Sequence, residues 1–215
     1  MPCQIYKLDN VDAGRCQNII MDSCLVDITI EFLAVAFHSI LYYTSTYPES
    51  IFETKKKYNI VVYRSMHPEL NQYIDLCLKS IAECLKSGQL KRLEFAITDN
   101  TYKPILKFIF DFDHMDVYDE TADAYLIKTE QNLRAFCLKL ATLSNKFTNL
   151  PQDGSFTIYI HTNESTAVAM ASKPDLEDFP LVEVDDKYED SDKILPIRRF
   201  SVRNCYIDTY IEFAK

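Results

Sequence analysis

The stretch from Cys24 to Tyr43, CLVDITIEFLAVAFHSILYY, is long and apolar on nearly every side. Leu25, Ile28 and Phe32 recur at helical spacing, and other apolar residues of the run fill the remaining faces. A helix that is apolar all round packs inside a core. Two acidic residues and a histidine interrupt the run, which makes a membrane span a poor alternative. The stretch therefore predicts a central helix around which a domain packs.

Two further helices are predicted downstream. Pro68 suits a first helical position, Glu69 suits the positive end of the helix dipole, and Gly88 suits a helix end. Between them, apolar residues recur every three or four positions at Leu70, Ile74, Cys77, Leu78, Ile81 and Leu85. A third helix is expected from about Thr121 to Phe147, with an apolar stripe formed by Leu126, Leu133, Phe136, Cys137, Leu140, Leu143 and Phe147.

Strand patterns lie between and after these helices. A short apolar stretch from Tyr58 to Tyr63 predicts one strand, and Phe156 to His161 predicts another. From Leu90 to Asp113 apolar and polar residues alternate on both sides of a turn at Asn100, which predicts a hairpin with one buried face. Alternation returns near the end of the chain, at Ile197, Phe200, Val202, Tyr206, Ile207 and Tyr210.

Composition argues against several classes of function. None of the three glycines begins a phosphate-binding loop, so a nucleotide-binding enzyme is disfavoured. The formal charge is −9, and nine acidic residues lie between Asp175 and Asp192 against the single Lys187. Without a basic surface, direct binding to nucleic acid is expected to be weak. The run Lys55 to Lys57 is short and is predicted to be a solvated surface loop.

Metal and thiol chemistry remain as an alternative hypothesis. His67, His114 and His161 lie far apart in the sequence and lack the close Cys and His spacing of a structural zinc site. The seven cysteines are dispersed and form no C-x-x-C pair, a pattern typical of reduced thiols in the nucleus or cytosol. We expect no cofactor and no metal, and we keep a thiol- or metal-dependent enzyme as the rival class.

The segment from Asn163 to Pro196 contains the acidic run and only brief apolar pieces, yet strand-like sequence bounds it on both sides. Such a segment, held at both ends, can work as a clasp. The chain also contains EFLAVAFHSILYYTSTYPESIFETKKKYNI, HPELNQYI, LRAFCLKL, FTIYIHT, DFP and YIE, in that order. In these motifs it resembles the HORMA domain family, and within that family the non-catalytic accessory subunits of DNA polymerase zeta.

The resemblance implies an α+β fold, a mainly antiparallel sheet backed by three helices. It covers residues 22–213 and leaves residues 1–21 as an N-terminal arm. Residues 163–213 would form a C-terminal "safety belt" and hairpin that close around a partner peptide. The peptide would add a strand to the open edge of the sheet, and release would require the belt to open.

The resemblance also assigns roles to particular residues. Tyr73 of HPELNQYI and Leu181, which follows DFP where relatives carry tryptophan, correspond to peptide contacts. Ile194, Asp208 and Tyr210 correspond to a surface that binds the C-terminal domain of an inserter polymerase. Asp208 replaces the amide side chain of the family. Arg134 of LRAF corresponds to an arginine used when two HORMA domains form a homo- or heterodimer.

The function implied is that of an adaptor, not an enzyme, in translesion DNA synthesis and DNA damage tolerance. It would clasp a proline-containing peptide of the polymerase zeta catalytic subunit and bridge it to the inserter polymerase. The implied location is the nucleus, with the cytoplasm as a further one, and no membrane is involved. The alternative within the family is a spindle-checkpoint or meiotic-chromosome adaptor with a different peptide client.

Overall fold

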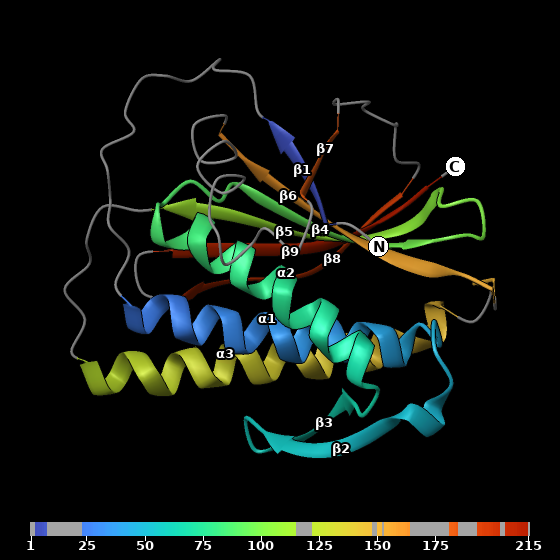
Figure 1. Cartoon of the computed structure of the whole chain (residues 1–215). Helices are drawn as coiled ribbons and strands as arrows, with labels where there is room; N and C mark the ends of the chain where they lie inside the picture. Colours follow the sequence, from blue (N-terminus) through green and yellow to red (C-terminus); the bar gives the residue numbers. More distant parts are fainter. Residues whose placement is uncertain are drawn as a thin grey trace.

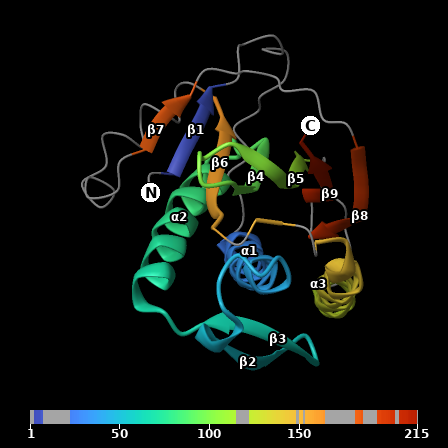
Figure 2. The ribbon, with the colours of Figure 1, turned by 90° about the vertical axis from the view of Figure 1, so that its right-hand side faces the viewer.

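The computed structural model of the 215-residue chain describes residues 3–7, 23–114, 122–147, 150–151, 153–163, 181–184, 193–202 and 205–214. Figure 1 shows a twisted sheet on one side of the helices α1, α2 and α3, and Figure 2 shows the small β2–β3 sheet on their other side. This arrangement confirms the predicted α+β class, a mainly antiparallel sheet backed by three helices.

The main sheet has seven strands in the spatial order β7-β1-β6-β4-β5-β9-β8. The strands from β6 to β8 in this order pair antiparallel, whereas β1 lies parallel to both β6 and β7. Their bounds are β1 (Cys3–Lys7), β4 (Arg92–Thr98), β5 (Pro104–His114), β6 (Ser155–Thr162), β7 (Leu181–Val184), β8 (Lys193–Val202) and β9 (Cys205–Phe213).

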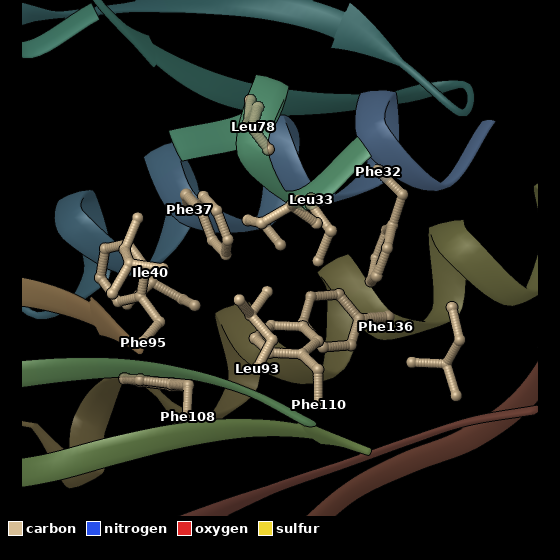
Figure 3. Close-up of a cluster of buried hydrophobic side chains, with 14 of the residues drawn as sticks. Phe32, Leu33, Phe37, Ile40, Leu78, Leu93, Phe95, Phe108, Phe110 and Phe136 are labelled. Carbon is tan, nitrogen blue, oxygen red and sulfur yellow. The ribbon is translucent and has the colours of Figure 1, made fainter. Parts of the chain in front are cut away.

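Helix α1 (Ser23–Tyr43) is the predicted central helix. Its length and apolar composition would suffice for a membrane span, but most of it is buried inside the domain. Figure 3 shows Phe32 and Phe37 pointing from α1 toward the sheet. The ring of Phe32 meets Phe136 edge-on at 4.9 Å between centroids, and Phe37 lies 4.9 Å from Phe95. The apolar run thus fills the space between the sheet and the other helices.

Helix α2 (Pro68–Lys86) begins and ends where its sequence predicts. Pro68 is in its first turn, and the Leu70 backbone N–H donates to Nδ1 of His67 at 3.4 Å. Gly88 follows the helix with a φ of 66°, a left-handed conformation that glycine adopts without a steric penalty. Its apolar stripe is buried against α1 and β6.

Helix α3 (Ala122–Leu143) is shorter than predicted, because a turn of 3-10 helix, η2 (Ser144–Lys146), continues it. The predicted stripe is buried from Leu133 onward, but Leu126 is 48% exposed and does not belong to the core. Figure 1 shows the first turns of α3 extending past the ends of the strands, where no part of the sheet covers them.

The lysine run is not a loop, as its sequence predicts, but part of a strand. A 3-10 turn, η1 (Glu49–Ile51), leads into β2 (Phe52–Lys57), which pairs antiparallel with β3 (Ile60–Ser65). The strand predicted at 58–63 therefore begins later. Tyr58 and Asn59 both have positive φ and form the two-residue turn between the strands. Pairing with β3 gives the lysine backbone its hydrogen bonds while the side chains stay in water.

The tip of this hairpin is attached to two helices. Lys57 Nζ lies 2.7 Å from Glu31 Oε2 on α1, and Asn59 Nδ2 donates to Glu130 Oε1 on α3 at 3.1 Å. An exposed ion pair such as Lys57–Glu31 contributes little by itself. Together the two contacts hold the β2–β3 sheet across α1 and α3, as Figure 2 shows.

The predicted hairpin at residues 90–113 forms as β4 and β5. However, β4 buries residues on both of its faces, including Glu94 on the face away from the helices. The predicted strands at 156–161 and near the end of the chain are also present, as β6, β8 and β9. The strand β1 has no counterpart among the sequence predictions, which left residues 1–21 as an arm.

Candidate functional site

The edge of the sheet beyond β6 contains a position that we call the strand slot, which lies between β6 and β7 and is filled by β1. On one side Gln4 and Ile5 lie opposite Tyr159 and Ile160 of β6. On the other side Ile5 lies opposite Glu183 of β7. Both pairings are parallel. A five-residue segment is therefore bordered by strands along both of its backbone edges.

The two strands that border the slot follow each other in the described sequence. β6 ends at Thr162 and β7 begins at Leu181. Both strands run in the same direction as β1. The slot is thus bordered by two parallel strands that are consecutive in the described sequence.

The two predicted peptide contacts lie at the same end of the strand slot. Tyr73, half-buried on α2, meets the ring of Phe156 on β6 edge-on, at 5.4 Å between centroids and 80° between planes. Leu181 begins β7 with its Cα opposite Cys3, the first residue of β1. Phe156 precedes the paired part of β6 at this same end. The structure therefore brings Tyr73 and Leu181 to the Cys3 end of the slot.

Aromatic rings connect this end of the slot to the core. Phe156 stacks on Phe95 of β4 at 5.0 Å and 11°, and Phe95 in turn contacts Phe37 of α1. Tyr47 also meets Phe156 edge-on at 6.2 Å. Offset and edge-to-face contacts of this kind add to the stabilisation from burial alone. Tyr73 thus packs on aromatic rings that continue into the core of the domain.

The three predicted polymerase contacts lie on one face of the sheet, the face opposite the helices α1, α2 and α3, which we call the open face. Ile207, Thr209 and Ile211 of β9 are buried toward the helices, so the alternate residues Asp208 and Tyr210 project from the open face. Ile194 of β8 is 58% exposed and pairs with Glu212 on this same face.

The hydroxyl of Tyr210 is held by two charged residues. Arg92 donates from Nε to Asp111 Oδ1 at 2.6 Å and from Nη2 to Asp111 Oδ2 at 3.0 Å. The same Nη2 donates to the Tyr210 oxygen, and the Tyr210 hydroxyl donates to Asp111 Oδ2, both at 3.0 Å. Burial raises the pKa of Tyr210, and Asp111 raises it further. Tyr210 therefore stays protonated and fixed in orientation.

Asp208 lies in a row of charged residues across the open face. Its Cα is opposite Asp111 on one side and Arg199 on the other. Arg199 approaches Asp113 to 3.9 Å and lies over the ring of Tyr206, 5.1 Å from its centroid. Like charges directly opposite each other on paired strands are destabilising. The Arg92 guanidinium compensates Asp111, and Arg199 lies opposite Asp208 on its other side.

A second charged cluster lies beside this row. Glu94 Oε1 is 2.9 Å from His161 Nε2, and Glu94 Oε2 is 3.2 Å from Lys107 Nζ. Burial alone would raise the pKa of Glu94, but the hydrogen bond from His161 and the charge of Lys107 lower it overall. The buried carboxylate is therefore ionised, and it joins β6, β4 and β5 on the open face.

Arg134 lies apart from both groups. It is exposed on α3, in the helix layer. On the same side of the helix, the exposed apolar residue Leu138 lies about one turn away and Ile127 about two turns away. This surface lies in the helix layer, apart from the slot and from the open face. The structure therefore does not bring Arg134 close to the other predicted site residues.

The residues considered for metal or thiol chemistry do not converge in the described part of the chain. His67 caps α2, and His161 contacts Glu94; the side chain of His114 lies outside the described residues. Among the residues that the structure describes, no group of three or more His, Cys, Asp or Glu side chains could hold a metal ion. Burial raises the pKa of the Cys137 and Cys205 thiols to about 12, so these two are protonated, weak nucleophiles at neutral pH.

The pattern of the sequence pointed neither to β1 nor to the Arg92–Asp111 pair. The hairpin prediction did place both charged residues on strands. Which residues face each other across a hairpin depends on its register, and apolar alternation alone leaves the polar face unassigned. For β1, five residues are too few for an alternating pattern to identify a strand.

Comparison with known proteins gives a consistent result. A family model described as "HORMA domain" matches residues 26–176. The human protein named "Mitotic spindle assembly checkpoint protein MAD2B" is 31% identical over 198 residues, which cover 91% of this chain and 94% of the human one. The Drosophila melanogaster protein named "DNA polymerase zeta subunit 2" is 28% identical over 155 residues, covering 72% of this chain and 78% of the fly protein.

A solved structure shares the fold. A chain of the "Crystal Structure of Mitotic Checkpoint Complex" superposes with a TM-score of 0.70 at 18% identity, over 88% of this chain and 95% of that chain. At this level of identity the likeness concerns the path of the backbone.

Proposed function

The chain belongs to the HORMA domain family, and we propose that it is a non-catalytic adaptor subunit of translesion DNA polymerase zeta. In this proposal it clasps a proline-containing peptide of the catalytic subunit beneath its safety belt. It also bridges that subunit to an inserter polymerase during DNA damage tolerance. One observation carries the proposal: the sheet has a slot that encloses an extended segment between two strands consecutive in the described sequence.

The chemistry of the slot suits an extended peptide of varied sequence. The edge of β6 offers backbone N–H and C=O groups, which any strand can pair with, and side-chain pockets supply selectivity. Tyr73 and Leu181 lie where such a pocket would select one residue of the client. Because the belt is covalently continuous, a client leaves only when the belt opens, and slow dissociation follows.

The open face suits a second partner bound at the same time. Three strands, β6, β4 and β5, separate β1 from β9 in the sheet. At about 4.8 Å a strand, roughly 19 Å lie between the slot and Tyr210. Ile194 supplies an exposed apolar contact, Tyr210 a fixed hydroxyl and Asp208 an acceptor. We assign this surface to the C-terminal domain of the inserter polymerase.

The remaining parts of the proposal concern assembly and location. Exposed Arg134 on α3 is the proposed contact between two HORMA domains, in a homo- or heterodimer. The name of the fly relative supports work at DNA in the nucleus, with the cytoplasm as a further location. Contact with nucleic acid would run through the polymerase, because the chain has a net charge of −9.

The first test is the affinity and dissociation rate of a proline-containing peptide from the polymerase zeta catalytic subunit. We expect tight binding and slow release by the wild type, and binding weakened about tenfold or more by Tyr73→Ala. Gln72→Ala, an exposed neighbour on the same helix, is the matched control and should bind as the wild type does. A folded wild-type protein that ignores the peptide would overturn the client assignment.

A second candidate function keeps the fold and changes the client. The printed name of the human relative includes the spindle assembly checkpoint, which favours a checkpoint adaptor. A meiotic-chromosome adaptor belongs to the same class. Peptides from checkpoint and meiotic proteins, assayed in parallel with the polymerase peptide, separate these clients by affinity.

A further inference from the structure

The occupant of the strand slot is part of the chain itself. Residues 3–7 lie between β6 and β7, in the position where the proposed function places the client. We propose that β1 is an intramolecular placeholder, which fills the client position until a client strand replaces it. This inference rests on the proposed function, and it adds a competition between the chain's own sequence and the client.

The first argument is that β1 and a client would use the same backbone groups. Gln4, Ile5, Tyr6 and Lys7 are paired with the edge of β6, and that edge is the one which faces away from β4. A strand has only two edges, and β4 already pairs with the other edge of β6. A client strand therefore cannot pair with β6 while β1 is in place.

The second argument concerns β7. Among the described strands, β7 pairs with β1 and with no other. Removing β1 without a replacement would leave both edges of β7 and one edge of β6 unpaired, and unpaired strand edges are unfavourable. The placeholder therefore keeps β7 aligned with the sheet, in the arrangement that a client would otherwise stabilise.

The third argument is that the placeholder can be exchanged. It is five residues long, so its strand pairing consists of few hydrogen bonds. A longer client, with a side chain that fits beside Tyr73, can outcompete it. Because β1 is joined to α1 by the intervening chain, it competes at a high effective concentration. The apparent affinity for a client is then reduced by the fraction of molecules in which the slot is filled.

Cysteine crosslinking tests the placeholder directly. Cys3 lies opposite Leu181, and neighbouring strands are about 4.8 Å apart, a separation that a disulfide can span. In a Leu181→Cys variant that also carries Cys16→Ser and Cys24→Ser, mild oxidation should join Cys3 to the new cysteine in high yield. The crosslinked protein should lose at least tenfold in peptide affinity, and reduction should restore the affinity of the uncrosslinked variant.

Two further measurements complete the test. Peptide added before the oxidant should suppress the crosslink, because β1 has left the slot. Ile5→Pro, which removes a backbone donor in the middle of β1, should bind the peptide several-fold more tightly than the wild type. Adding Cys3→Ser to the crosslinking variant removes the bond and should abolish the effect of oxidation.

The outcomes separate the two proposals. Unchanged peptide affinity in the crosslinked protein would overturn the placeholder while leaving the clasp intact. The absence of a crosslink in the protein without peptide would overturn it as well, whatever the client. A high yield of crosslink together with no peptide binding by the wild-type protein would instead reject the client assignment, and with it the competition, although β1 would be confirmed in the slot.

Discussion

Tyr210 on β9 donates its hydroxyl hydrogen to Asp111 on β5 over 3.0 Å, although 99 positions separate the two residues in the chain. Arg92 on β4 donates to both of them. One hydrogen-bond network thus joins three neighbouring strands on the open face, and it fixes the hydroxyl that we assign to partner binding.

Tyr210→Phe tests what this network contributes to stability. The substitution removes the hydroxyl and leaves Asp111 and Arg92 each one hydrogen bond short. Since hydrogen bonds to charged groups are the stronger ones, we expect the free energy of unfolding to fall by about 1–2 kcal/mol. Urea denaturation measures it. The control is Tyr206→Phe, because Tyr206 lies on the same strand and face and its hydroxyl makes no hydrogen bond among the described residues. This substitution should change the free energy of unfolding little. Equal losses in the two variants would contradict the network's role.

Ile194→Asp tests the proposed polymerase surface without disturbing the fold, because this side chain is 58% exposed. A charge in an apolar contact should weaken binding of the inserter polymerase C-terminal domain at least tenfold, while affinity for the peptide stays unchanged. Ile127→Asp on α3, at 62% exposure, is the matched control. Calorimetric titration of both variants with the polymerase domain measures the two affinities. Equal affinities would place the polymerase contact on another surface.

Arg134→Ala tests the proposed contact between HORMA domains. If α3 forms that contact, the wild type should associate as its concentration rises and the variant should stay monomeric. Sedimentation velocity measures the two states. Lys139→Ala removes another exposed cation of α3 and should still associate. Association that survives Arg134→Ala would place the dimer contact elsewhere.

His38 makes the stability of the domain depend on pH. Burial, and to a lesser extent the charge of Arg64, lower the pKa of this histidine from 6.5 to about 4. Between these two pKa values, the unfolded chain therefore binds a proton at His38 and the folded chain does not. Stability is complete above about pH 6.5 and should decline by up to about 3 kcal/mol as the pH falls from 6.5 toward 4.

His38→Asn isolates this contribution. The Ser65 backbone N–H donates to His38 Nδ1 at 3.3 Å, and an asparagine oxygen can accept in its place without titrating. The variant should show a flatter stability profile between pH 6.5 and 4 when unfolding is followed by circular dichroism. Ionised Glu94 contributes separately, because its lowered pKa matters only below its usual value of 4.5. An unchanged slope in the variant would exclude His38 as the cause.

Gly154, which precedes β6, lies where the chain has no room for a side chain. A Cβ there would lie 2.6 Å from the backbone oxygen of Thr98 on β4. Because a backbone atom cannot move aside cheaply, Gly154→Ala should destabilise the domain by roughly 1–3 kcal/mol. Thermal unfolding measures the loss, and Asp153→Ala, an exposed neighbour, is the control. A variant as stable as the wild type would show that β6 can shift at this end.

The helices could be predicted from the sequence because each carries a strong local signal. Pro68 and Gly88 mark the ends of α2, and the apolar run of α1 leaves only a narrow polar stripe that includes Asp27 and Glu31. Leu126 was predicted to be buried because a stripe does not reveal where the sheet that covers it ends. Lys55 to Lys57 were assigned to a loop because charge was taken as a sign of irregular structure, whereas a strand at the edge of a sheet can carry lysines.

The candidate site could be predicted only in part, and for a different reason. Tyr73 and Leu181 came from a resemblance, and nothing local to either residue indicates that both lie toward one end of a slot. Cys3 to Lys7 pair with strands that lie far along the chain. Such pairings depend on the whole topology, which a local period does not contain.

The position of β9 in the sheet has a consequence for synthesis of the protein. β9 pairs Phe213 with Leu106 and Cys205 with His114, so it completes the edge of β5 only after the region between them has been made. At the usual rate of translation this takes on the order of 5–20 s. During that time a nascent chain exposes an unpaired strand in the middle of its future sheet. Newly made molecules should therefore depend on chaperones, and truncation before β9 should lead to aggregation.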